Sequence, residues 1–357
     1  PDQYKGKKVT LISANSSIEE LASEFYSEKY NQSLASAKKK SKKSKKSQAE
    51  PVRLVTNLSR PYAITNGLDG KHLALWQSHG WYYDQPLQRW EWQRARIFET
   101  VEDLYTQSYV VPFLVPMLEN AGANVMLPRE RDYGRREYIV DNDKPLQGYS
   151  EFNGDKAWTT GESNGFANPN KFYVQGENPF TMGTYREVEG VVKKKKSSPV
   201  ESTAKWTPEF IVSRHVDMAV YVSYKTLPNS TDAAYYTVKY NGGSCQFKVN
   251  QQMGGGTWIY LGTFPFSYSS SDSREQGVYL TNLTDKEGVV VTADGVKFGG
   301  GMGNIARNPH PDNQTFKIDP KVSNYPRFTE GARYWLQWAG FADTVYSYTN
   351  NKNDYTD

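Results

Sequence analysis

Residues 72–132 constrain the fold of this chain more than any other stretch. A short apolar run ends at Trp76, and a polar, aromatic loop is expected after Ser78-His79-Gly80. A long stretch with helical spacing of apolar residues comes next, and a second apolar run covers residues 125–127. Gly122 is the expected stop of the helical stretch. A strand, a crossover helix and a second strand form a βαβ unit, which predicts a parallel sheet.

Two prolines interrupt the expected crossover helix. Pro112 and Pro116 lack the backbone N–H that a helix interior needs. We therefore predict a kink, or two consecutive helices, with the break between residues 108 and 113.

Chemistry-bearing side chains follow both predicted strands. His79 lies in a Ser-His-Gly sequence after the first strand, and the run from Arg129 to Asp132 follows the second. In parallel sheets, sites lie just beyond the carboxyl ends of the strands. Imidazole is a usual zinc ligand, so His79 is a candidate metal ligand, with a structural histidine as the alternative.

The carboxylate partner of such a site has three candidates. Thr100 can cap a helix and would place Glu102 in its first turn, where a carboxylate is favoured. Glu102 therefore ranks first, Glu91 second and Glu99 third. The alternative interpretation is that Glu102 only complements the helix dipole.

These motifs resemble those of the zinc-dependent N-acetylmuramoyl-L-alanine amidases, which cut peptidoglycan. The matching segments are residues 78–80, 100–104 and 128–132. The resemblance implies that His79 and Glu102 hold Zn²⁺ and that Arg129 and Asp132 are structural or bind substrate. A metal-activated water would then attack an amide carbonyl.

The chain departs from the amidase pattern at one essential point. Those enzymes need another zinc-binding histidine in a Ser-Ile-His motif and a catalytic glutamate near the domain end. His72, His215 and His310 lie in no such motif. Two ligands do not make a catalytic zinc site, so we expect the missing histidine beyond Asp357, or a metal-free protein that keeps the fold.

The sequence changes character near residue 148. Short runs that alternate with period two cover residues 219–224 and 235–240, and a hairpin turn signal follows at 241–243. Many short strands at regular spacing predict a β-sandwich or jelly roll. Residues 254–264 and 291–298 resemble the carbohydrate-binding-like domain of golvesin and xanthan lyase proteins, and this resemblance covers residues 150–305.

Together these features predict two kinds of domain. Residues 1–147 are expected to begin an α/β amidase-like domain with a parallel sheet, and residues 148–305 to form a jelly-roll-like β-sandwich. Residues 306–357 would return to the α/β domain through a helix in 326–340, and that domain would be truncated.

Aromatic side chains of a sandwich can stack on sugar rings. The candidates are Trp158, Tyr173, Tyr224 and Trp258. For each, a place in the core is the alternative, and it is favoured for Trp258 because this residue lies in a predicted strand.

Charge and hydropathy exclude several classes. The net charge is +4, and much of the excess lies in lysine runs in residues 35–50 and 193–196, so the folded body is near neutral and nucleic acid is not implied. We expect residues 35–50 to be a solvated tether, with contact to an anionic surface as the alternative. No apolar run approaches the roughly 20 residues of a membrane span.

The function favoured by the sequence is a hydrolase of the cell envelope that acts on peptidoglycan or another envelope polysaccharide. The alternatives are a non-catalytic glycan-binding surface protein and a polysaccharide lyase. No signal peptide is present, and the chain starts at Pro1 without Met. We do not take this as a sign of the cytoplasm, and we expect a secreted or periplasmic protein.

Overall fold

The chain divides into two compact units, Pro1–Glu50 and Pro51–Asp357. The computed structural model describes residues 12–13, 16–17, 51–62, 64, 67–84, 86–194, 198–209, 215–267, 275–307 and 321–346. In the first unit, β1 (Ile12–Ser13) and β2 (Ser16–Ser17) form an antiparallel pair. The lysine-rich segment 35–50 lies outside the described residues.

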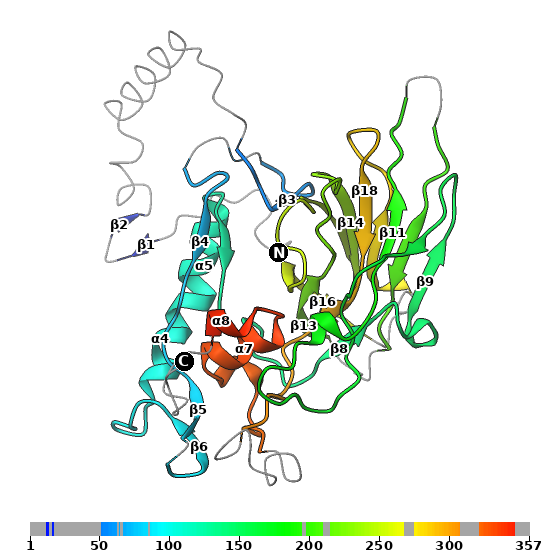
Figure 1. Cartoon of the computed structure of the whole chain (residues 1–357). Coiled ribbons are helices and arrows are strands. Elements are labelled where there is room, and N and C mark those ends of the chain that lie inside the picture. Colours follow the sequence, from blue (N-terminus) through cyan, green and yellow to red (C-terminus); the bar gives the residue numbers. More distant parts are fainter. Residues whose placement is uncertain are drawn as a thin grey trace. The chain divides into compact units, whose positions relative to one another are not determined.

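Two antiparallel sheets build a β-sandwich in the second unit (Figure 1). The six-stranded sheet has the order β3 (Val55–Asn57), β15 (Gly243–Val249), β14 (Ala234–Tyr240), β17 (Gly277–Thr281), β12 (Thr203–Trp206) and β9 (Tyr149–Phe152). The four-stranded sheet has the order β16 (Ile259–Phe266), β13 (Val216–Val222), β19 (Val296–Phe298) and β8 (Tyr138–Val140). A smaller sheet contains β10 (Thr159–Thr160), β11 (Arg186–Glu189) and β18 (Val290–Ala293). The predicted sandwich is therefore confirmed, and it also uses two strands that precede residue 148.

The alternation of buried and partly exposed side chains along the strands explains how the two sheets pack together. In β14 the side chains of Ala234, Tyr236 and Val238 are buried while their neighbours are partly exposed. The hairpin to β15 turns at Gly242, whose φ of 87° suits a glycine. Inward side chains of both sheets meet in one apolar core that includes Trp206, Val220, Tyr236, Phe247, Phe266, Leu280 and Phe298.

The predicted βαβ unit is present. β4 (His72–Ala74) and β7 (Asn124–Met126) pair in parallel. The crossover consists of α4 (Glu102–Tyr109), a π-turn η2 (Val110–Leu114) and α5 (Val115–Asn120), so the interruption expected near Pro112 is observed. Gly122 ends the helical stretch with a φ of 104°. The described residues add no third strand to this pair, and the larger parallel sheet of an amidase-like domain is not shown.

The βαβ unit has a small core of its own. One cluster of buried apolar side chains in it consists of Val111, Val115 and Leu127. Its crossover helices leave large apolar side chains exposed, namely Tyr105, Tyr109, Phe113, Leu114 and Met117. The unit therefore depends on contacts with its surroundings for stability.

A hairpin and two short helices complete the described fold. β5 (Trp81–Asp84) and β6 (Arg89–Trp92) pair antiparallel where a loop was expected. The helix expected in residues 326–340 is α7 (Ala332–Trp338), followed by α8 (Asp343–Tyr346). On one side of α7, Tyr334 accepts a hydrogen bond from the backbone of Tyr83 at 2.9 Å. The aromatic residues of α7 pack in a cluster with Phe166, Tyr221 and Trp258; these are Tyr334, Trp335 and Trp338.

Short 3₁₀ turns are η3 (Pro145–Gln147), η4 (Pro179–Thr181) and η6 (Arg327–Thr329). No helix in the described part of the chain is both long and apolar enough to cross a membrane.

Candidate functional site

Arg129 holds the loop that carries His79. Its Nη1 donates to the carbonyl oxygens of Ser78, at 3.1 Å, and of His79, and its Nη2 donates to the carbonyl of Phe328 at 3.0 Å. Ser78 has a φ of 140°, a conformation that costs energy for a residue with a side chain. The buried guanidinium stabilises this strained loop, which favours the structural alternative for Arg129 over a role in substrate binding.

The His79 ring faces a guanidinium. Its Nε2 lies 2.8 Å from Nη2 of Arg94, and because arginine can only donate, Nε2 accepts this hydrogen bond. In this arrangement the Nε2 lone pair points at a cation. Asp103, not Glu102, is the buried carboxylate of the first helical turn, and burial raises its pKa.

The other carboxylate candidates lie elsewhere. Glu102 is exposed at the start of α4. Glu91 pairs with Arg89 in the β5–β6 hairpin at 2.9 Å, and Glu99 is exposed. Within the described ranges, no three His, Cys, Asp or Glu side chains are arranged to hold a metal ion. The described residues therefore do not fit a zinc ion, and a ligand from another part of the protein stays a prediction.

Asp132 also has a structural place. Its Oδ2 accepts from the backbone N–H of Ala219 and its Oδ1 from that of Gly134, both at 2.6 Å. The residue is buried, and burial raises its pKa. These bonds tie the segment after β7 to β13 of the sandwich, which favours the structural alternative for Asp132 as well.

The aromatic residues predicted to stack on sugars are core residues. Trp158 is 4% exposed, and Tyr173 and Tyr224 are fully buried. The hydroxyl of Tyr173 donates to Asn168 at 2.7 Å, and that of Tyr224 donates to the carbonyl of Met253 at 2.6 Å. None of the three can offer a ring face to a ligand, which corrects that prediction.

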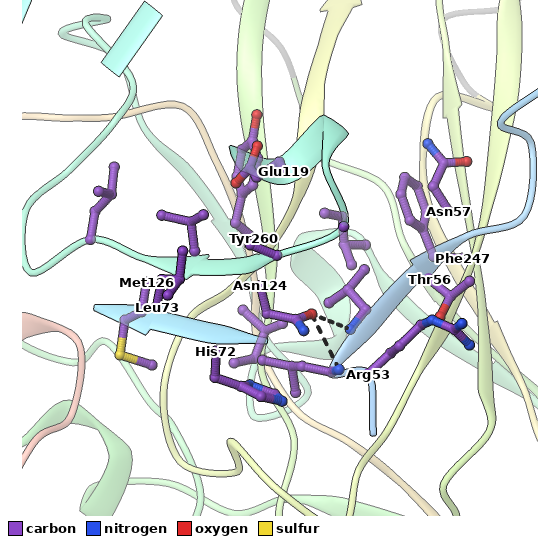
Figure 2. Close-up of a pocket in the computed structure, with 18 of the residues that line it drawn as sticks. Arg53, Thr56, Asn57, His72, Leu73, Glu119, Asn124, Met126, Phe247 and Tyr260 are labelled. Carbon is purple, nitrogen blue, oxygen red and sulfur yellow. Dashed lines mark hydrogen bonds between the residues drawn. The ribbon is translucent and has the colours of Figure 1, made fainter. Parts of the chain in front are cut away.

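A cleft of about 790 Å³ lies between the sandwich and the βαβ unit. One wall is made by β3 with parts of β15 and β16, and the other by β4 and β7. Figure 2 shows Leu73 and Met126 on the parallel pair and Phe247 beside β3. The walls are therefore largely apolar, with further lining from Leu54, Ile64, Val125, Ile259 and Leu261.

Polar groups also line this cleft. Arg53 forms a two-pronged ion pair with Asp69, with both N–O distances at 2.6 Å. Asn124 accepts hydrogen bonds from the backbone of Leu54 and Val55 at 3.2 and 3.3 Å, as Figure 2 shows. These contacts connect the strand β3 to the parallel pair and fix two polar side chains at the cleft.

Two tyrosines line the cleft in different ways. Arg131 lies over the ring of Tyr260, with its guanidinium carbon 3.8 Å from the ring centroid, and pairs with Glu119 at 2.8 Å. Tyr62 is 54% exposed, and Arg60 lies 5.3 Å from its ring centroid. Tyr62 is therefore an aromatic ring at the cleft that a ligand can reach.

No pattern in the sequence indicated this cleft. Arg53 and Tyr62 precede the predicted βαβ unit, Asn124 and Arg131 flank its second strand, and Tyr260 lies in a sandwich strand. Their proximity depends on how β3 joins the six-stranded sheet, and periodicity does not report such pairings.

Comparison with known proteins identifies one part of the chain. Residues 180–300 match the Golvesin C-terminal domain. This is about a third of the chain, and the golvesin-like resemblance of the sandwich is confirmed over this range. The amidase-like resemblance of the remaining chain has no support from the comparisons. A search of curated proteins finds no significant relative.

Two solved structures show weaker similarity. A Paenibacillus xanthan lyase is 23% identical over 46% of this chain and 13% of its own, with a TM-score of 0.32. A structure described as showing the promiscuous specificity of carbohydrate-binding modules of the β-sandwich superfamily is 16% identical. It matches over 49% of this chain and 62% of its own, with a TM-score of 0.24. Such scores do not establish a shared fold.

Proposed function

We propose that this chain is a carbohydrate-binding protein and that the cleft between β3, β16 and the β4–β7 pair is its binding site. The observation that carries the proposal is the mixed lining of the cleft, in which apolar walls meet an exposed tyrosine and fixed polar side chains. Sugars present apolar C–H faces together with many hydroxyl groups, and such a lining complements both. The volume lies within the range of about 300–1,000 Å³ typical of ligand pockets and leaves room for a short oligosaccharide.

Each polar group has a defined part in this proposal. The exposed ring of Tyr62 would stack on the apolar face of a sugar. Arg53 and Asp69 would donate to and accept from its hydroxyls, because their side chains are already oriented by their mutual ion pair. We infer that the ligand is peptidoglycan or another envelope polysaccharide, which implies a secreted or envelope-bound protein.

Metal-dependent hydrolysis is not part of this proposal, since the described residues do not supply a zinc ligand set. A lyase would need a tyrosine or histidine that takes a proton beside an arginine. Tyr260 lies under Arg131, but burial raises the pKa of its phenol, and its hydroxyl is 2.9 Å from that of Thr263. A phenol with a raised pKa stays protonated at neutral pH, so Tyr260 is a poor candidate for the base of a lyase.

Titration calorimetry with soluble peptidoglycan fragments and with neutral oligosaccharides tests the proposal. Tyr62→Ala should weaken binding about tenfold, because one stacking contact is lost. Arg53→Ala should weaken it by a similar factor. Two exposed residues outside the cleft, Tyr105 and Arg89, provide the matched controls Tyr105→Ala and Arg89→Ala.

Three results are informative. Binding of peptidoglycan fragments alone would support an envelope ligand, and binding of the neutral sugars alone would keep the site but change the ligand. If no glycan binds, or if the control variants weaken binding as much as the cleft variants do, the proposal is wrong.

A further inference from the structure

The charged side chains that line the cleft are not balanced. The lining contains two acidic residues, Asp69 and Glu119, and no lysine. Its arginines are Arg53, Arg60, Arg129 and Arg131. The lining therefore carries more positive than negative groups, and a cleft with an excess of one charge favours a ligand of the opposite charge.

Three of these arginines are engaged within the protein. Arg53 forms the two-pronged ion pair with Asp69. Arg131 pairs with Glu119 at 2.8 Å and lies against an aromatic ring. Arg129 is 1% exposed and donates to backbone carbonyls. A ligand that took a hydrogen bond from one of these guanidinium groups would compete with a partner that is already in place.

Arg60 differs from the other three. Among the described residues no carboxylate forms an ion pair with it. It is partly exposed, and its guanidinium carbon lies 5.3 Å from the ring centroid of Tyr62. A cation–π contact is attractive but does not neutralise the charge. Arg60 therefore brings a positive charge to the cleft that no described carboxylate compensates.

A proline joins this arginine to the exposed tyrosine. Arg60, Pro61 and Tyr62 are consecutive, and all three line the cleft. Pro61 fixes its own φ and restricts the backbone of the residue before it. The segment therefore has fewer conformations to lose when a ligand binds, which lowers the entropic cost of binding.

A guanidinium beside an exposed ring suits a sugar that carries a carboxylate. Tyr62 is 54% exposed and can stack on the apolar face of a sugar ring. A carboxylate attached to that sugar would project from the edge of the ring, within reach of the long side chain of Arg60. The planar guanidinium can donate two parallel hydrogen bonds to it. A phosphate monoester carries nearly two charges and three acceptor oxygens, which is more than one guanidinium satisfies.

We propose that the cleft selects an acidic glycan and that Arg60 binds the carboxylate of the sugar that stacks on Tyr62. This inference rests on the proposed function, because it assigns the specificity of the same cleft. The carboxylate can belong to a uronic acid or to the lactyl group of a muramic acid. In either case a neutral sugar with the same ring should bind more weakly.

Titration calorimetry of the full chain with two matched pairs of sugars tests this specificity. One pair is N-acetylglucosaminyl-N-acetylmuramic acid and di-N-acetylchitobiose, which differ by the lactyl group. The other pair is trigalacturonic acid and its methyl ester, which differ by the charge of the uronates. In each pair that binds, the acidic sugar should bind about tenfold more tightly than the neutral one. Added salt should reduce this preference, because it screens the charges.

Three variants test the part of Arg60 in this preference. Arg60→Gln should reduce it from about tenfold to less than about twofold, because the charged donor is lost. Tyr62→Ala should weaken binding of both sugars of a pair by a similar factor, since stacking does not depend on the carboxylate. Arg135→Gln removes an exposed arginine outside the cleft lining and should keep the full preference. Thermal unfolding confirms that each variant is folded at the temperature of the titration.

The possible outcomes separate this inference from the proposed function. If the neutral sugar of a pair binds as tightly as the acidic one, the cleft remains a glycan site but the inference is wrong. It is also wrong if Arg60→Gln keeps the full preference, or if Arg135→Gln removes it as completely as Arg60→Gln does. If none of the four sugars binds, the inference and the proposed function are both overturned.

Discussion

Lys297 and Glu130 form an ion pair with both side chains fully buried, and their Nζ and Oε2 atoms are 2.6 Å apart. The same lysine donates to the carbonyl of Gly299 at 2.6 Å and lies 4.2 Å from the ring centroid of Tyr221. Glu130 follows β7 and Lys297 lies in β19, so this pair joins the βαβ unit to the sandwich. A buried pair that satisfies its remaining donors and acceptors holds two elements in one relative position.

Lys297→Met should destabilise the chain by about 3–5 kcal/mol, because it leaves the charge of Glu130 buried without its partner. The double variant Lys297→Met with Glu130→Gln should recover part of this loss. Urea unfolding measures both. The exposed pair Lys239–Glu275 provides the control, and Lys239→Met should cost less than about 1 kcal/mol. Equal losses for the buried and the exposed lysine would contradict the role given to Lys297.

The variant Arg129→Lys tests whether Arg129 holds the loop that carries His79. A lysine cannot reproduce the forked set of hydrogen bonds to the carbonyls of Ser78, His79 and Phe328. We expect a loss of about 2–3 kcal/mol in the free energy of unfolding, because buried carbonyls lose charged donors.

Hydrogen exchange locates the effect of that substitution. The amides of residues 77–80 should exchange faster in Arg129→Lys, while those of the sandwich strand β14 should keep their protection. Arg135→Lys, at an exposed arginine, should change neither. Unchanged exchange in the loop would show that other contacts position His79.

Local patterns predicted the local parts of this fold. Alternation predicted strands such as β14 and its turn at Gly242, and helical spacing with Pro112 predicted the interrupted crossover. These features depend on neighbours in sequence, since side-chain direction follows the period of each element. The pairing of β3 with β15 joins residues nearly 200 positions apart, and no periodic signal reports it.

Predictions of site residues failed where they depended on knowing which side chains are buried. Trp158 and Tyr224 are of residue types that stack on sugars, but both side chains lie in the buried core of the sandwich. His79 lies in the loop after β4, where a ligand was expected, but its partner Arg94 follows the β5–β6 hairpin, where a loop was expected. The sequence therefore predicted where the His79 loop lies along the chain, whereas tertiary contacts determine which groups surround the His79 ring.

Tyr224→Phe separates a core tyrosine from a binding one. It removes the hydroxyl that donates to the carbonyl of Met253 at 2.6 Å and keeps the buried ring. We expect a loss of about 1–2 kcal/mol in stability, since a buried acceptor loses its donor. Affinity for a glycan should stay unchanged, in contrast to Tyr62→Ala at the cleft. Weaker glycan binding by Tyr224→Phe, measured at a temperature where the variant is fully folded, would argue against the cleft as the site.

Glu330 should make stability depend on pH. Burial raises the pKa of its carboxyl group to about 7, although Arg327, Ser323, Arg307 and Arg129 favour the charged form. In the unfolded chain the pKa returns to about 4.5. Between pH 4.5 and pH 7 the folded state binds more protons at Glu330 than the unfolded state does. The contribution of Glu330 to the free energy of unfolding is therefore complete below pH 4.5 and is lost as the pH rises to about 7.

The neutral variant Glu330→Gln isolates this contribution from other buried acids that titrate in the same window. Its stability relative to the wild type should increase by about 3 kcal/mol between pH 4.5 and pH 8, since one pKa unit corresponds to about 1.4 kcal/mol. Urea unfolding at a series of pH values measures the difference. Glu275→Gln, at an exposed glutamate, should give a constant difference across the range. A constant difference for Glu330→Gln as well would mean that the nearby arginines keep Glu330 ionised in the folded state throughout.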